Sequence, residues 1–332
     1  MSKTFDYQIP VINSLRGLAA LLVCLYHYIY TTTDFIQQEL ILDIASFGKY
    51  GVQIFFIISG IVIPISLIKA NFKYKLFNKF ILKRFIRIEP PYLISVIIGI
   101  IYLNVRNYMP GSADLDLSPT FYDIILHLGY LIPFFENANW ISPVYWTLSV
   151  EFQYYLILAI AFPLMIHPKL IFRSVFYLFL FITPFIFSNS SFFLYWTSFF
   201  GLGILYALYF TKKINLKEFI PVLIILCLSV AINLSYLELL IGIGTLSIIH
   251  FFKDFNPRIG EFFGKISYSL YLLHSVFGKP VINFLSHRVS LPYEKFLVVT
   301  IGLTISIIAA YALFRLVEKP THELSKRIKL KT

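Results

Sequence analysis

A fixed cation and a titratable base share the first hydrophobic segment of the chain, residues 11–30. Arg16 and His27 lie eleven positions apart in otherwise apolar sequence. At about 100° per residue, that separation returns to nearly the same helix face, about 16 Å further along the axis. Charged groups inside a membrane are costly and usually face a cavity. Two interpretations stay open: Arg16 extends to the lipid headgroups and His27 is a hydrogen-bonded core histidine, or both belong to a site.

A basic cluster precedes the third hydrophobic segment, in the stretch KRFIRIEPPY. Arg84 and Arg87 are three residues apart, and Glu89 with two prolines follows, which we expect to mark the start of a helix. Arginine binds phosphate oxygens through two parallel hydrogen bonds, so a nucleotide-bearing thioester would suit this pair. An ordinary basic loop on the cytoplasmic side of the membrane explains the neighbouring lysines as well, and both interpretations stay open.

A single carboxylate, Glu151, interrupts the apolar stretch WTLSVEFQYY at residues 146–155. Thr147 and Tyr155 lie one helical turn to either side, on the same face. A buried carboxylate must be paired, hydrogen-bonded or protonated. Glu151 could therefore orient a histidine base, bind a sugar hydroxyl or hold an arginine in place, and functional and structural roles stay equally open.

Other polar residues in apolar segments give weaker signals. Ser59 precedes Gly60 in the second segment, where the small pair favours close packing between helices. The stretch SYSLYLLH ends in His274, and its tyrosines, Tyr271 among them, line a polar path or simply pack. The remaining histidines have no metal-ligand spacing, and no serine elbow, phosphate-binding loop or paired CxxC is found. We therefore expect no metal and no bound cofactor.

Composition places these residues in a membrane. The chain of 332 residues is 58% hydrophobic and 14% charged, with a mean hydropathy of +0.77. Soluble domains carry about 25% charged residues, so we predict an integral membrane protein, in contact with lipid, rather than a soluble globule. The net charge of +11 reports topology and anionic lipid, and we expect no nucleic-acid partner.

The apolar runs predict an all-α polytopic membrane protein: one domain over residues 1–332, a single bundle of about ten transmembrane helices. We expect spans near 11–30, 44–68, 88–105, 144–166, 171–187, 192–210, 219–235, 237–252, 266–287 and 295–317. Residues 121–135 are shorter and amphipathic, which predicts a re-entrant or interfacial segment.

Lysine and arginine gather in every second connection between the predicted helices. Because basic loops remain on the cytoplasmic side, we expect both termini in the cytoplasm, with a cytoplasmic tail over about residues 318–332. Arg16 then lies near the cytoplasmic boundary and His27 toward the outer half of the membrane. We expect the first segment to be retained rather than cleaved as a signal peptide, and no soluble domain to be appended at either end.

Taken together, these motifs resemble the integral-membrane acyltransferase type 3 family. The similarity runs through nearly the whole chain in order, in SLRGLAALLVCLYH, GVQIFFIISGIVI, KRFIRIEPPY, WTLSVEFQYYL, ISYSLYLLH and the late EKP. Two departures are Ile61, where the family commonly has Phe, and Thr147, where Ser is frequent and the hydroxyl is kept.

The resemblance implies transfer of an acyl group, usually acetyl, from cytoplasmic acyl-CoA, a co-substrate rather than a bound cofactor. The acceptor would be a hydroxyl of a carbohydrate or lipid-linked glycan of the cell envelope, and the location the bacterial cytoplasmic membrane. Some members carry an additional esterase-like domain, and we expect this chain to be the membrane domain alone.

The resemblance also implies roles for particular residues. His27 maps to the catalytic histidine, which would activate the acceptor hydroxyl or relay the acyl group, oriented or assisted by Glu151. Arg84 and Arg87 map to the acyl-CoA-binding arginines. Arg16 maps to the arginine of the first helix, with a catalytic and acyl-CoA-binding role, holding a phosphate or polarising the path of the pantetheine. The acceptor or channel would be lined by Ser59, Trp146, Thr147, Tyr155, Tyr271 and His274. Histidine can serve as the base that deprotonates the acceptor hydroxyl, and arginines can stabilise the developing negative charge.

Two other functions fit parts of the sequence. A transporter or lipid-linked glycan flippase would also need many helices with intramembrane charges, but it predicts repeat symmetry and paired broken helices, which the sequence does not show. A catalytically silent scaffold for envelope biosynthesis is the third interpretation. The transporter interpretation also leaves the spacing of Arg16 and His27 unexplained.

Overall fold

The computed structural model describes residues 9–107 and 118–330, and within these residues the chain is helical, without β-strands. The α-helices are α1 (Val11–Leu25), α2 (Glu39–Ser46), α3 (Gly51–Lys69), α4 (Phe77–Asn107), α5 (Phe121–His127), α6 (Trp146–Met165), α7 (Leu170–Ile186), α8 (Thr197–Phe210), α9 (Leu216–Asn233), α10 (Tyr236–Phe251), α11 (Arg258–Leu273), α12 (Gly278–Ser286), α13 (Pro292–Leu313) and α14 (Lys319–Arg327).

Two π-helical segments interrupt or extend these helices. Segment η1 (Tyr26–Tyr30) continues α1, and η6 (Phe314–Glu318) joins α13 to α14. Short 3₁₀ segments are η2 (Phe47–Tyr50), η3 (Tyr74–Leu76), η4 (Ile132–Phe134) and η5 (Phe193–Tyr195). Single π-helical turns are uncommon and are frequent at functional sites, so their two positions are informative.

Six of the ten predicted spans have helices long and apolar enough to cross a membrane, among the residues that the structure describes. They are Val11–Tyr30, Glu39–Lys69, Tyr74–Arg106, Trp146–Met165, Leu216–Asn233 and Pro292–Arg327. Three more predicted spans coincide with the shorter apolar helices α7, α8 and α10. The tenth, predicted over 266–287, is divided between α11 and α12, so the predicted number of about ten is confirmed only in part.

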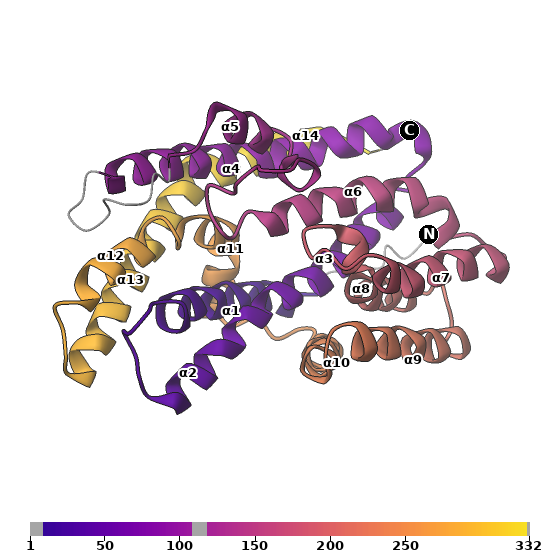
Figure 1. Ribbon diagram of the computed structural model, residues 1–332. Coiled ribbons are helices and arrows are strands. Elements are labelled where there is room, and N and C mark those ends of the chain that lie inside the picture. Colours follow the sequence, from indigo (N-terminus) through magenta and orange to yellow (C-terminus); the bar gives the residue numbers. More distant parts are fainter. Residues whose placement is uncertain (1–8, 108–117, 331–332) are drawn as a thin grey trace.

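The bundle is elongated, with α2, α12 and α13 toward one end and α7 and α9 toward the other (Figure 1). Helix α1 packs along α11, and α3 packs along α8. Close approach of α3 and α8 needs Gly60 and Gly203: a Cβ on Gly60 would overlap the carbonyl oxygen of Phe200 and lie 3.1 Å from the Cα of Gly203. This confirms the packing interpretation of the Ser59-Gly60 pair.

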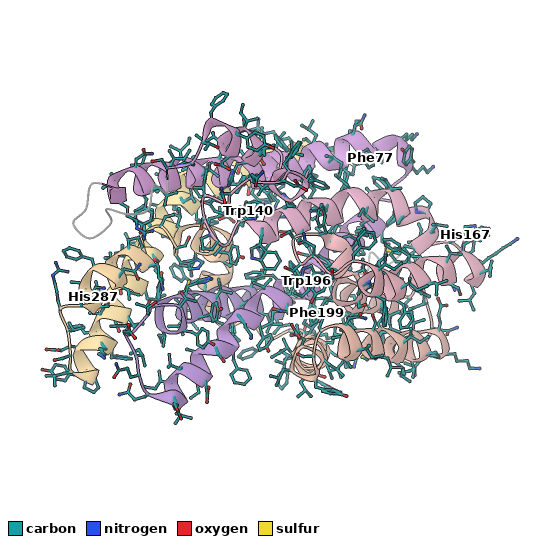
Figure 2. The ribbon with its side chains drawn as sticks, viewed as in Figure 1. Phe77, Trp140, His167, Trp196, Phe199 and His287 are labelled. Atoms are coloured by element: carbon teal, nitrogen blue, oxygen red, sulfur yellow. The ribbon has the colours of Figure 1, made fainter. Side chains whose placement is uncertain are left out.

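Aromatic side chains fill the core between α3, α6 and α8. Phe56 stacks on Phe200 with ring centroids 4.7 Å apart, and Trp146 stacks on Trp196 at 6.0 Å. Trp196 and Phe199 lie within the bundle, whereas His167 and His287 lie toward its opposite ends (Figure 2). Helix α1 packs on α3 of this aromatic core, and α4 packs on α6.

The expectation that the Glu-Pro-Pro stretch starts a helix is wrong. Pro90 and Pro91 lie inside α4, which begins at Phe77. Proline removes a helical hydrogen bond, but membrane helices tolerate it where neighbouring groups satisfy the backbone. The two prolines leave the carbonyls of Ile86 and Arg87 without their helical donors. Next to them, the carbonyl of Ile88 accepts a hydrogen bond from the hydroxyl of Tyr268, in α11, at 2.7 Å.

The segment expected to be a tail from about 318 continues the last long helix. Segment η6 leads without a break into α14, which packs against α4. Residues 331–332 of that expected tail lie outside the described residues. Because α14 is held against α4, its side chains can contribute to the interior of the bundle.

Candidate active site

One cavity gathers most of the polar residues that the sequence singles out. Its walls come from α1, α3, α4, α6, α11, η6 and α14, and its empty volume, open mouth included, is about 1000 Å³. The predicted site residues in its lining are Arg16, Ser59, Arg84, Arg87, Thr147, Glu151, Tyr155 and Tyr271. Packing of helices that are distant in sequence thus brings together residues as far apart as Arg16 and Tyr271.

Three guanidinium groups line this cavity. Arg84 is 4% exposed, lies over the rings of Phe80 and Tyr155 at 5.3 and 5.6 Å, and donates to the hydroxyl of Ser66 at 3.4 Å. Its buried Nε has no hydrogen-bond partner. Within the described residues no ion pair joins Arg16, Arg84 or Arg87 to a carboxylate. The cavity therefore holds three cations without direct counter-ions.

The carboxylate of Glu151 is held by hydroxyl groups. Its Oε1 accepts hydrogen bonds from Ser59 at 2.9 Å and from Tyr155 at 2.5 Å. Of the roles that the sequence left open, a direct pair with an arginine is therefore not formed. The expected position of Tyr155 beside Glu151 is confirmed, whereas the contact with Ser59 was not predicted. Thr147 turns instead to Tyr271, with 2.8 Å between the two hydroxyl oxygens.

His27 lies outside the lining of the cavity and pairs with His274. Nδ1 of His27 is 3.1 Å from Nε2 of His274 and 3.0 Å from the carbonyl oxygen of Val23. Nδ1 of His274 is 2.8 Å from the carbonyl oxygen of Tyr271. Because a carbonyl oxygen only accepts, Nδ1 of His274 carries its proton and Nε2 its lone pair.

The same reasoning sets the tautomer of His27. With both rings neutral, Nδ1 of His27 faces two acceptors, Val23 and His274, and must carry the proton. The lone pair of His27 is then on Nε2, which makes no hydrogen bond to any described residue. A ring in this state presents a free basic nitrogen. It lies within the π-helical turn η1.

Tyr271 connects the two groups of residues. It lines the cavity, and its ring centroid is 6.0 Å from that of His274. Phe55, also in the lining, contacts it edge to face at 5.8 Å. Tyr271 therefore lies between the cavity, which it lines, and His274, the partner of His27.

A family model described as an acyltransferase domain matches residues 9–315, nearly the whole chain. The chain belongs to the acyltransferase type 3 family. No curated protein and no solved structure matches it. The protein is therefore a membrane acyltransferase, and the cavity with the adjacent histidine pair is its candidate active site.

Two cavity residues of this acyltransferase were not assigned to the site from the sequence. Glu318, the last residue of η6, lines the cavity and accepts a hydrogen bond from Ser269 at 2.6 Å. His322, one turn further on in α14, lines it as well. The late EKP motif was the available signal, but the sequence placed it at a helix end instead of in the cavity.

Two predicted lining residues lie elsewhere: His274, which pairs with His27, and Trp146. Trp146 is absent from the cavity lining, and its ring packs between Phe56 and Trp196. Its position supports the aromatic block behind the site. The catalytic and binding roles predicted for the remaining residues stay predictions.

Proposed function

We propose that this acyltransferase moves an acetyl group from acetyl-CoA to a hydroxyl of a cell-envelope carbohydrate. The observation that carries the proposal is the cavity with three arginines that have no carboxylate partners. Coenzyme A bears several phosphate groups, and arginine is the side chain best suited to bind them. Arg84 and Arg87, one turn apart on α4, would bind the phosphates, with Arg16 opposite them on α1.

Transfer itself needs a base near the thioester. Nε2 of His27 would take the proton of the acceptor hydroxyl while its oxygen attacks the thioester carbonyl. The new C–O bond forms, the C–S bond breaks, and the proton passes on to the coenzyme A thiolate. For this the thioester end must extend past Tyr271 toward His27, with the phosphates remaining among the arginines.

Glu151 is suited to the acceptor rather than to the histidine. Its hydrogen bonds to Ser59 and Tyr155 use Oε1, and Oε2 makes no hydrogen bond to the described part of the chain. A carboxylate oxygen in this position would accept a hydrogen bond from a sugar hydroxyl. The ring of His27 is oriented by His274 instead of by Glu151.

The proposed location is the bacterial cytoplasmic membrane, with the arginine cavity open to the cytoplasm, where acetyl-CoA is found. The distribution of basic residues supports this orientation. The acceptor would be a polysaccharide or a lipid-linked glycan. Membrane lipid surrounds the apolar outer faces of the helices.

The test is acetyl transfer by membranes that contain the protein, supplied with radiolabelled acetyl-CoA and envelope glycan. Wild type is compared with His27→Ala and with His287→Ala, an exposed histidine at the end of the bundle. We expect label in glycan with wild type and His287→Ala, and a loss of about 100-fold or more with His27→Ala. Equal labelling by all three would remove His27 from the chemistry. Absence of label across several acyl-CoAs would overturn the proposal.

A further inference from the structure

The ammonium group of Lys279, in the first turn of α12, is bound to the helix end that carries His27. It donates three hydrogen bonds: to the carbonyl oxygen of His27 at 2.7 Å, to Oγ1 of Thr31 at 2.8 Å and to Oγ1 of Thr32 at 2.7 Å. An ammonium group has three protons, so all of them are used within the protein. Lys279 therefore has no proton to offer a substrate.

The helix end needs such a partner because its last carbonyls have no backbone donors. Two threonine hydroxyls satisfy part of this need: Thr31 donates to the carbonyl of His27 at 2.8 Å, and Thr32 to that of Tyr28 at 2.7 Å. Lys279 adds a positive charge at the C-terminal end of the helix, where the dipole favours cations. It thus completes the cap of η1 at His27 itself.

The turn that carries Lys279 also carries His274. The backbone N–H groups of Gly278 and Lys279 both donate to the carbonyl of His274, each at 3.1 Å. Gly278 has no room for a side chain, because a Cβ there would overlap the hydroxyl of Tyr28. One short turn, residues 274–279, therefore holds His27 in two places: its ring through His274, and its main chain through Lys279.

We infer that Lys279 is a positioning residue, which fixes the π-helical turn so that Nε2 of His27 points to the reacting groups. The inference rests on the proposed role of His27 as the base. Lys279 contacts neither acyl donor nor acceptor. Its loss therefore lowers the rate of the chemical step and leaves acyl-CoA binding, which the cavity arginines provide, nearly unchanged.

The experiment compares wild type with Lys279→Met, Lys279→Arg and the control Lys295→Met, all purified in detergent. We expect kcat to fall about 10- to 100-fold in Lys279→Met, as small misplacement of a catalytic group does, while KM for acetyl-CoA stays within about twofold. Lys279→Arg keeps the charge and the donors and recovers most of kcat. Lys295→Met matches wild type.

Arg173→Met controls for simple loss of stability, because it breaks the ion pair with Glu218 between α7 and α9 and leaves every bond of Lys279 intact. If Lys279→Met and Arg173→Met lose equal amounts of kcat at equal melting temperature, Lys279 serves stability alone and the inference is overturned. A rise in KM without change in kcat would also overturn it.

Hydrogen–deuterium exchange of peptides spanning residues 26–32 separates this inference from the proposed function. If wild type shows no acetyl transfer, the proposed function fails, but the effect of Lys279 on the order of η1 is still measured. Faster exchange in Lys279→Met but not in Lys279→Arg supports the inference that Lys279 fixes η1. Unchanged exchange in Lys279→Met overturns it.

Discussion

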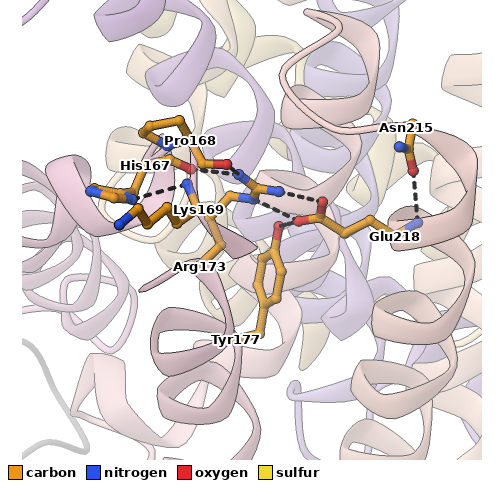
Figure 3. A network of polar contacts seen from close by, with 7 residues as sticks. All are labelled: His167, Pro168, Lys169, Arg173, Tyr177, Asn215 and Glu218. Carbon is orange, nitrogen blue, oxygen red and sulfur yellow. Dashed lines mark hydrogen bonds and ion pairs between the residues drawn. The ribbon is translucent and has the colours of Figure 1, made fainter. Parts of the chain in front are cut away.

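The same two residue types, arginine and glutamate, are used in opposite ways in two regions of the molecule. Between α7 and α9, Arg173 and Glu218 form a two-pronged ion pair, with Nη2 to Oε2 at 2.6 Å and Nε to Oε1 at 2.7 Å (Figure 3). Tyr177 donates to the same carboxylate at 2.7 Å, and Arg173 also donates to the carbonyl oxygens of His167 and Pro168. Both charges are compensated inside the protein.

In the cavity, by contrast, three arginines and two glutamates lie in one lining without an ion pair among the described residues. Glu151 and Glu318 are held by hydroxyl groups, from Ser59 and Tyr155 and from Ser269. A guanidinium that is already in a two-pronged ion pair has few donors left for a ligand, whereas one without an ion pair keeps them. The comparison teaches that pairing, rather than residue type, separates the structural region from the candidate site.

The largest effect is expected from the cavity arginines. Each charged hydrogen bond to a phosphate contributes about 1.5–3 kcal/mol, so Arg16→Ala with Arg87→Ala should lower kcat/KM by about 100-fold or more, mainly through KM for acetyl-CoA. The melting temperature should change little, because neither arginine has an ion-pair partner to lose. Steady-state kinetics and thermal melting in detergent test this. A large loss of stability with unchanged KM would place these arginines with the structural region.

Arg173→Met should have the opposite signature. It leaves Glu218, about 10% exposed, without its partner, and breaking such a pair costs about 3 kcal/mol of unfolding free energy. The turnover of the molecules that remain folded should equal that of wild type. Denaturation curves measure the first quantity and active-site-normalised rates the second. Recovery of stability in the double variant Arg173→Met, Glu218→Leu would show that the unpaired charge causes the loss.

Glu151→Gln sharpens the comparison, because it removes a charge while keeping the size of the side chain. We expect kcat/KM for the acceptor to fall about tenfold with KM for acetyl-CoA unchanged, since the carboxylate is proposed to bind the acceptor hydroxyl. Tyr155→Phe and Ser59→Ala, which each remove one donor to Glu151, should lose less. If KM for acetyl-CoA rises instead, Glu151 acts through the arginines.

The smallest effect is expected at α5, a helix outside the six candidate membrane spans. As in the region of Arg173 and Glu218, its polar side chains are hydrogen-bonded within the protein. Burial by itself raises the pKa of Asp123, but hydrogen bonds from the backbone of Asn139 and from Thr120 outweigh it and lower the pKa. Burial also lowers the pKa of His127, whose Nε2 accepts from the backbone of Ile141. Both groups therefore stabilise this segment in their deprotonated states.

Stability from a lowered pKa is complete above the pKa of the unfolded chain and is lost as the pH falls toward that of the folded state. For His127 the loss begins below about pH 6.5, and for Asp123 below about pH 4. Hydrogen exchange of peptides from residues 118–145, corrected for the intrinsic rate, should accelerate as the pH falls through 6. Exchange of peptides around Arg173 should not accelerate over the same pH range. Identical profiles for both regions would contradict this assignment.

Local sequence rules were sufficient to predict contacts between residues one helical turn apart, and to predict helices where the surrounding lipid requires them. High apolar content dictated helices, because a backbone in lipid must satisfy its own hydrogen bonds. The four-residue spacing of Glu151 and Tyr155 predicted their contact. The order of the six motifs indicated the family that the comparison then showed.

Tertiary structure alone decided the contacts between helices. His27 meets His274 and Lys279, which follow it by 247 and 252 residues, and no local rule selects those partners. Glu318 reaches the cavity because η6, the π-helical segment that ends with it, packs on α4. The sequence determined which side chains could do chemistry. Their meeting depends on helix packing, where small residues such as Gly60 set how closely two backbones approach.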